Sequence, residues 1–190
     1  MAIPRSETKK QALLEAAMQV VAVHGVAAPT SQIAKEAKVA EGTLFRYFPT
    51  KDDLLNDLFI YLLQSLGGSL LSEYDPDAPL RIRAQTVWEN YISWGIRNMN
   101  GHSAMTQLAV SERIRPQTRS AAMELCSGVR GVFDTCKFEG IRGEASVEFA
   151  EEVLSAIAQV TIANASRSPV EAETYIRAGF AVMWSGIHGD

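Results

Sequence analysis

The segment from Thr30 to Lys51 constrains the fold of this chain more than any other part of its sequence. Its apolar residues recur at helical spacing on both sides of Val39, which places them on one face of each of two short helices. Packing of these faces against each other, with Val39 filling the turn, gives a helix-turn-helix. The apolar residues are Ile33, Ala34, Ala37, Leu44 and Phe48.

The start and the outer face of this helix pair are also marked in the sequence. Pro29 disfavours helix upstream, and Thr30 is expected to cap the first helix with its hydroxyl group. Thr43, Arg46 and Tyr47 point away from the apolar face of the second helix. A second helix of this kind lies in the major groove of DNA, so these three residues are free to contact DNA.

At these positions the sequence resembles the tetracycline-repressor (TetR) type of bacterial transcriptional regulators. The pattern of that family is a first helix ending in Gly, then T-x-x-I-A, A-x-V, G-T-L followed by an aromatic residue, F, and a Lys three residues beyond that Phe. The match covers about the first quarter of the chain, and its many fixed spacings make it specific. The matching residues are Gly25, Thr30, Ile33, Ala34, Ala37, Val39, Gly42, Thr43, Leu44, Phe45, Phe48 and Lys51.

The resemblance implies a set of DNA-contacting residues in the second helix and around it. Residues matching Thr43, Tyr47 and Lys51 typically meet phosphates in the family, whereas Gly42 lets the backbone come close to another surface. The expected DNA-binding residues are Thr30, Ser31, Glu41, Gly42, Thr43, Phe45, Arg46, Tyr47 and Lys51.

The sequence departs from the family pattern at three positions. Phe45 lacks the hydroxyl group of the usual Tyr, so one phosphate contact is expected to be missing. Ala40 replaces the Ser often found as the cap of the second helix, and Ala is a poor cap. Glu41 repels phosphates unless it accepts a hydrogen bond from a cytosine amino group, which predicts a role in specificity.

Charge divides the chain into a basic part and an acidic part. Residues 1–51 hold seven Lys or Arg against four Glu, a formal charge of +3, so the remainder carries −7 within the net −4. A basic head on an acidic body favours binding DNA through the head. We expect residues 1–51 to be a helix-turn-helix DNA-binding domain and residues 52–190 to be a helical effector-binding and dimerisation domain.

No segment predicts a strand, so the expected fold class is all-α: an N-terminal three-helix head joined by a long helix to a helical body. Thr50 and Asp53 resemble a capping box that opens the long helix. Gly67 and Gly68 then either kink this helix or allow a neighbouring helix to approach closely. A first helix is expected at about 6–24, and after a loop at 74–79 further helices are expected at 79–100, 102–114, 116–138, 146–167 and 169–187, with a break at Gly101.

The two helices at 146–167 and 169–187 are unusually apolar. In the family the matching pair forms a four-helix dimer interface, so we expect a homodimer through these helices; the alternative is an ordinary intramolecular core. Two heads on a two-fold axis would read an inverted repeat in double-stranded DNA.

Aromatic and sulfur-containing side chains on the middle helices predict an effector pocket for an apolar or aromatic small molecule, as the resemblance implies. Three of them recur at helical spacing, which is also typical of a core. His102 either supplies a polar group to the pocket, together with Gln107 and Arg113, or is a surface histidine in a loop. The expected pocket residues are Trp88, Tyr91, Trp94, His102, Met105 and Phe133.

Other functional classes are disfavoured by the sequence. The three histidines lie far apart and the two cysteines form no C-x-x-C pair, so neither a metal nor a cofactor is expected. Cys126 and Cys136 lie about 15 Å apart on a helix, too far for a disulfide, which favours free buried thiols over a redox switch. There is no G-x-S-x-G and no glycine-rich phosphate loop, which argues against an enzyme. With no long apolar run and no signal-peptide pattern, we expect a soluble, cytoplasmic protein.

These patterns together predict a DNA-binding transcriptional regulator. We expect a repressor that is released from a palindromic operator when a small molecule in the body shifts the linking helix. The alternative is a helical small-molecule-binding protein with weak or vestigial DNA binding.

Overall fold

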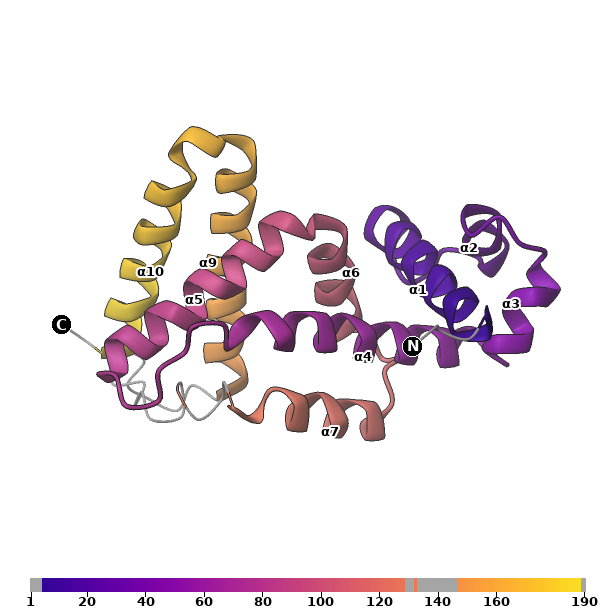
Figure 1. The fold of residues 1–190 in the computed structure, drawn as a ribbon, viewed down its shortest axis with the longest axis horizontal. Coiled ribbons are helices and arrows are strands. Elements are labelled where there is room, and N and C mark those ends of the chain that lie inside the picture. Colours follow the sequence, from indigo (N-terminus) through magenta and orange to yellow (C-terminus); the bar gives the residue numbers. More distant parts are fainter. Residues whose placement is uncertain (1–4, 129–131, 133–146, 189–190) are drawn as a thin grey trace. The chain divides into compact units, whose positions relative to one another are not determined.

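The computed structural model describes residues 5–128, 132 and 147–188, and no strand is found among them. This confirms the all-α prediction (Figure 1). Within the same ranges, no helix is both long and apolar enough to cross a membrane. The helices are α1 (Arg5–His24), α2 (Thr30–Glu36), α3 (Glu41–Tyr47), α4 (Lys51–Leu70), α5 (Leu80–Arg97), α6 (Met99–Ala109), α7 (Pro116–Leu125), α9 (Val147–Arg167) and α10 (Ala172–His188), with a short 3-10 turn η1 (Pro169–Glu171) before α10.

The chain forms two compact units. The first combines residues 1–65 with residues 98–125, and the second combines residues 66–97 with residues 126–190. Helices α6 and α7 therefore belong to the same compact unit as the head helices α1 to α3. The functional division at residue 51 stays a prediction.

The core of the first unit forms as the helical spacing predicted. Leu13 of α1, Ile33 of α2 and Leu44 of α3 are each at most 1% exposed, and so is Phe48 just after α3. The long helix α4 contributes Leu54, Leu55, Leu58 and Leu62 to the buried set. Burial of such side chains stabilises a fold by about 1.5 to 3 kcal/mol each, so the apolar stripes are what hold these short helices together.

The start of α4 carries the predicted capping box. The hydroxyl oxygen of Thr50 accepts a hydrogen bond from the backbone N–H of Asp53 at 3.1 Å, and the carboxylate of Asp53 accepts one from the backbone N–H of Thr50 at 3.0 Å. Two N–H groups that lack partners within the helix are thereby satisfied. Helix α1 ends just before Gly25, as the sequence predicted. Gly25 has a φ of +79°, a left-handed conformation that glycine adopts without strain.

The predicted interruption of the long helix at Gly67 and Gly68 and the predicted break at Gly101 are wrong. Helix α4 continues through Gly67 and Gly68, and a Cβ atom at either position would meet nothing within 4 Å among the described residues. Gly101 lies inside α6 rather than at a break, because the helices separate at Asn98. A Cβ at Gly101 would lie 3.4 Å from Sδ of Met18, which is ordinary van der Waals contact.

Helix α6 ends at Ala109, five residues before its predicted end, because the following segment turns away from a helical path. The predicted helix at 116–138 corresponds to α7 in its first half. Phe133 and Cys136 lie outside the described residues, and Cys126 is half-buried.

In the second unit, α9 and α10 lie side by side and pack on α5 (Figure 1). The indole N–H of Trp88 in α5 donates to the carbonyl oxygen of Ile176 in α10 at 2.9 Å. Gly179 lies where the three helices meet: a Cβ there would lie 2.7 Å from Cζ2 of Trp88 and closer still to Oγ1 of Thr161. Only a residue without a side chain allows this approach.

We therefore expect Gly179→Ala to destabilise the protein by about 1 to 3 kcal/mol, because the added methyl group overpacks the junction of α5, α9 and α10. Urea unfolding at one fixed protein concentration measures this change. Gly68→Ala is the matched control, since its methyl group meets open space in a helix and should be neutral or stabilising by up to about 1 kcal/mol. Equal stability of the two variants would contradict the packing role of Gly179.

Candidate nucleic-acid interface

The turn between α2 and α3 reverses the chain within a few residues. The backbone N–H of Val39 donates to the carbonyl oxygen of Ala34 at 3.0 Å, which closes the turn. Lys38 has a φ of +55°, in the left-handed region. This conformation costs a residue with a side chain about 1 to 2 kcal/mol, so the tertiary packing of α2 on α3 must impose it.

The structure places all nine predicted DNA-binding residues on accessible surface of the head. Each is exposed or half-buried, whereas Leu44 and Phe48 on the opposite face of α3 are at most 1% exposed. Phe45 is 40% exposed, which is unusual for a large apolar side chain in an otherwise packed head. One face of α3 is therefore committed to the core and the other is left accessible.

The predicted capping role of Thr30 is wrong. The N-cap of α2 is Pro29, no side chain caps this helix, and Thr30 is its first residue. The hydroxyl group of Thr30 instead donates to Oε1 of Glu41 at 2.6 Å. The two residues lie eleven positions apart in the sequence, and the turn brings the beginnings of α2 and α3 close enough for this bond.

The beginning of α3 is built with little local stabilisation. Ala40 occupies its N-cap position in an extended conformation and provides no side-chain hydrogen bond, as the sequence predicted. A Cβ atom at Gly42 would meet nothing within 4 Å, so packing inside this chain does not require a glycine there. Both residues are consistent with a helix start that another molecule approaches.

Lys51, the first residue of α4, is half-buried beside the head. Burial lowers the pKa of its ammonium group, and the nearby guanidinium of Arg113 lowers it further, while Asp52 opposes this. The ammonium group of Lys51 thus lies near the guanidinium of Arg113 and the carboxylate of Asp52.

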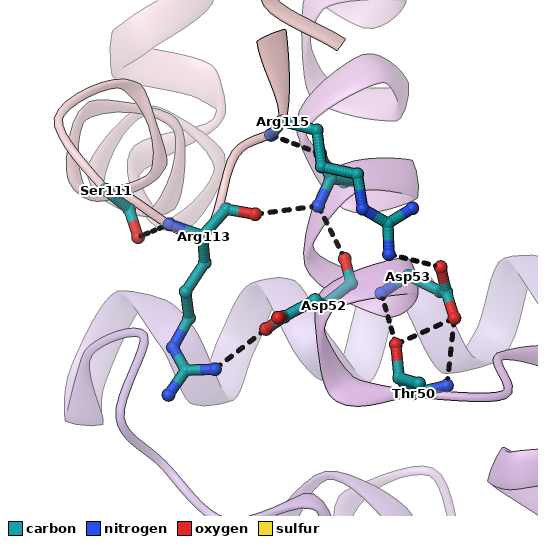
Figure 2. A network of polar contacts seen from close by, with 7 residues as sticks. Thr50, Asp52, Asp53, Ser111, Arg113 and Arg115 are labelled. Atoms are coloured by element: carbon teal, nitrogen blue, oxygen red, sulfur yellow. Dashed lines mark hydrogen bonds and ion pairs between the residues drawn. The ribbon is translucent and has the colours of Figure 1, made fainter. Parts of the chain in front are cut away.

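Figure 2 shows the polar contacts between the segment that joins α6 to α7 and the first turns of α4. The buried side chain of Asn56 fastens this segment to α4. Its amide nitrogen donates to the carbonyl oxygens of Asp52 at 2.7 Å and of Arg113 at 2.9 Å. Its amide oxygen accepts from the backbone N–H of Arg115 at 3.0 Å. A single side chain thereby satisfies backbone groups of two separate segments.

Two ion pairs surround this contact. Arg113 Nη1 lies 2.7 Å from Oδ1 of Asp52, and Arg115 Nη2 lies 2.6 Å from Oδ1 of Asp53. The hydrogen bond from the Thr50 hydroxyl, followed by that from Arg115, holds the pKa of the Asp53 carboxyl below its ordinary value. Since these groups are largely solvated, water screens both ion pairs.

The sequence does not reveal this connection. No sequence spacing relates Asn56 to residues 57 and 59 positions later, so the pairing becomes visible only in the folded chain. Arg113 had been assigned to an effector pocket together with Gln107. Gln107 instead donates to the carbonyl oxygen of Val21 in α1 at 3.1 Å.

The predicted effector residues fall in both units. Trp88, Tyr91 and Trp94 belong to the second unit, where the two tryptophans are at most 4% exposed and burial, followed by the nearby Cys126, raises the pKa of Tyr91 to about 12. His102 and Met105 belong to the first unit and are buried in α6. Phe133 lies outside the described residues, and the role of all six in effector binding stays a prediction.

The interpretation of His102 as a surface histidine in a loop is wrong. The side chain is 7% exposed and lies in α6, the helix that packs on α1. Burial lowers the pKa of its imidazole, because the charged form loses hydration.

An apolar groove runs between α9 and α10. Its volume is about 410 Å³, and Val160 and Val182 on its walls are 63% and 61% exposed. Other apolar residues of the same helices, including Ile162, Phe180 and Met183, are buried inside the chain. The apolar character predicted for these helices thus serves an intramolecular core on one side and leaves an exposed groove on the other.

Within the described part of the chain, no group of three or more His, Cys, Asp or Glu side chains is arranged to hold a metal ion.

Comparison with known proteins places these features among bacterial regulators. Residues 13–58 match the profile of bacterial regulatory proteins of the tetR family. The fatty acid metabolism regulator protein of Bacillus subtilis (strain 168) is 28% identical over 138 residues, which cover 70% of this chain and 69% of that protein. Other curated relatives are covered over only 36% to 42% of their own length.

Solved structures share the fold over nearly the whole chain. A tetR family regulator from Shewanella sp. PV-4 has a TM-score of 0.77 at 24% identity, over 94% of this chain and 97% of that one. The TetR-like regulator LfrR of Mycobacterium smegmatis, in complex with proflavine, has a TM-score of 0.65 at 22% identity, over 94% and 96% of the two chains. At this level of identity the likeness concerns the fold alone.

We expect Asn56→Leu to destabilise the protein by about 1 to 3 kcal/mol, because it leaves the carbonyl group of Arg113 and the N–H group of Arg115 without their partner. Denaturant unfolding measures the loss, and hydrogen exchange should show that the Arg115 amide loses protection. Arg113→Ala removes only a solvated ion pair and serves as the control. If it costs as much as Asn56→Leu, the buried amide is not what fastens the loop.

Stability should also fall as the pH drops below 6.5 because of His102. The unfolded chain takes up a proton at a pKa of about 6.5, whereas the folded chain, in which the pKa of His102 is lowered, does not. The free energy of unfolding therefore falls as the pH drops, by up to about 1.4 kcal/mol per pH unit until the folded-state pKa is reached. Urea titrations of the wild type and of His102→Gln across this range test the assignment. A variant that keeps the wild-type pH dependence would rule it out.

Proposed function

Because this chain belongs to the TetR family of bacterial transcription regulators, we propose that it acts as a homodimer whose two heads bind an inverted-repeat operator in double-stranded DNA. Its activity is DNA binding and not catalysis. We further propose that it is a cytoplasmic repressor, released from the operator by an apolar or aromatic small molecule.

The observation that carries this proposal is the division of α3 into a buried face and an accessible face. The accessible face and its surroundings hold all nine expected DNA-binding residues. Thr43, Tyr47 and Lys51 are assigned to phosphates, and Arg46 lies on the same accessible side. Gly42 at the start of the helix leaves room for the close approach of a DNA backbone.

The apolar groove between α9 and α10 supports the homodimer. Exposed Val160 and Val182 would be removed from water by the same helices of a second chain. A two-fold interface brings identical surfaces together, which suits a groove formed by two neighbouring helices of one chain. We propose helices 146–167 and 169–187 as the interface.

The fastening of the α6–α7 segment to α4 supports an effector response. Helix α4 begins at Lys51, one of the residues assigned to phosphates, and Asn56 lies little more than a turn further along it. A displacement of α6 would therefore change the position of the start of α4, because the hydrogen bonds of Asn56 join the α6–α7 segment to α4 and break or move together. To release DNA, the effector would have to bind the displaced arrangement of α6 and α4 more tightly than the DNA-bound arrangement.

The effector class rests on the aromatic residues predicted to line a pocket, and the proflavine complex of LfrR shows that a relative in fold binds a planar aromatic molecule. The rival function is a small-molecule-binding protein whose head no longer binds DNA. The carboxylate of Glu41 on the accessible surface is the observation that favours it.

The test is a gel-shift titration of the region upstream of its own gene, together with a selection from random DNA sequences. We expect sequence-preferring binding by two chains per site, with an affinity that falls steeply with salt. Lys51→Ala should weaken all sequences similarly and lower the salt slope by about one per head, hence by about two for a dimer.

Lys9→Ala provides the matched control, because Lys9 is exposed on α1 and is not one of the nine predicted contact residues. It should leave the salt slope within a few tenths of the wild-type value. An unchanged slope in Lys51→Ala would remove that residue from the phosphate contacts. Absence of sequence preference in both assays would leave the rival function as the better account.

A further inference from the structure

The hydrogen bond between Thr30 and Glu41 changes what the head offers to DNA. The two residues begin α2 and α3, and both are accessible. Their oxygen atoms lie 2.6 Å apart, a short distance typical of a hydroxyl group that donates to a carboxylate. This bond joins the two helices of the helix-turn-helix on its accessible side.

The hydrogen bond uses the only side-chain donor of the two residues, the hydroxyl group of Thr30. The hydroxyl hydrogen of Thr30 is directed at Oε1 of Glu41, so the Thr30 oxygen has only lone pairs left to offer. An ionised carboxylate is also an acceptor only, and Oε2 of Glu41 has no partner among the described residues. The pair therefore presents acceptors and no donor to an approaching molecule.

A surface of acceptors discriminates between the groups of DNA. Phosphate oxygens are themselves acceptors and carry negative charge, so they are repelled. In the major groove, the donors are the exocyclic amino groups of cytosine and adenine, whereas guanine offers only acceptors and thymine an acceptor and a methyl group. The chemistry of the pair thus fits an amino group and fits a phosphate poorly.

We propose that Thr30 is a positioning residue that holds the Glu41 carboxylate to read one amino-bearing base, cytosine or adenine, in each half of the operator. The Glu side chain has several rotatable bonds, and a fixed partner removes the need to order it when DNA binds. This inference rests on the proposed function. It also replaces the expected direct contact of Thr30 with DNA.

The two roles of Thr30 predict different results for Thr30→Val, which keeps the shape of the side chain but lacks the hydroxyl group. If Thr30 contacts a phosphate, Thr30→Val should weaken binding to all DNA sequences similarly and lower the salt slope of the affinity. A positioning role leaves the salt slope unchanged and relaxes base preference at one position of each half-site. Thr30→Ser keeps the hydroxyl group and should restore the preference.

The experiment is a competition among operator variants, substituted one base pair at a time, at one fixed salt concentration. We expect the wild type to prefer cytosine or adenine at one position of the half-site by about tenfold or more, and Thr30→Val to reduce that preference to a few-fold at most. Glu41→Ala should remove the preference at the same position. In the Glu41→Ala background, adding Thr30→Val should change nothing further.

The outcomes separate the inference from the function on which it rests. If the wild type shows no sequence preference, the proposed function fails first. If the wild type discriminates and Thr30→Val discriminates equally, or if Thr30→Val lowers the salt slope, only the positioning role is overturned. Thermal unfolding of each variant confirms that the head is folded, and Glu41→Ala alone decides the position that is read if Thr30→Val does not fold.

Discussion

The buried amide of Asn56 is the contact on which the organisation of the first unit depends. It satisfies backbone groups of α4 and of the α6–α7 segment at the same time, and a buried polar group that loses its partner is costly. The segment therefore cannot leave α4 gradually. Arg119 adds to this arrangement from α7, because its guanidinium donates to the carbonyl oxygens of Ala109 and Ser111 at the end of α6. A contact that is either made or broken suits a regulator with two states.

The accessible side of the head is stabilised less well than its core. Lys38 has a left-handed backbone, the N-cap residue Ala40 has no capping side chain, and Gly42 stands in a helix where alanine would fit. Each feature lowers the stability of the isolated head by roughly 1 kcal/mol. The core residues of α2 and α3 show no such departures. Local departures of this kind are expected where a surface serves binding.

In the second unit, α9 and α10 each have a buried apolar face and an exposed apolar face. Ile162, Phe180 and Met183 hold α9 and α10 to the chain's own core, while Val160 and Val182 face the groove. Gly179 permits this arrangement because it lets α10 approach Trp88 and Thr161 closely. The same helices thus have a core face and an exposed face, so part of their apolar surface serves an intramolecular core, and the interface through the exposed face stays a proposal.

The sequence by itself determined most of the helices, the buried faces of the head and the capping box at Thr50 and Asp53, because helical periodicity and capping act over three or four residues. It did not determine the bounds of α6. Tertiary structure decided the bond of Thr30 with Glu41, the contacts of Asn56 and the burial of His102. It also decided which glycine is needed: Gly179 lies at a close approach, whereas a Cβ at Gly67 or Gly68 would meet nothing within 4 Å among the described residues. Periodicity specifies the face on which a residue lies. It cannot specify which distant segment meets that face, because that depends on how whole helices pack.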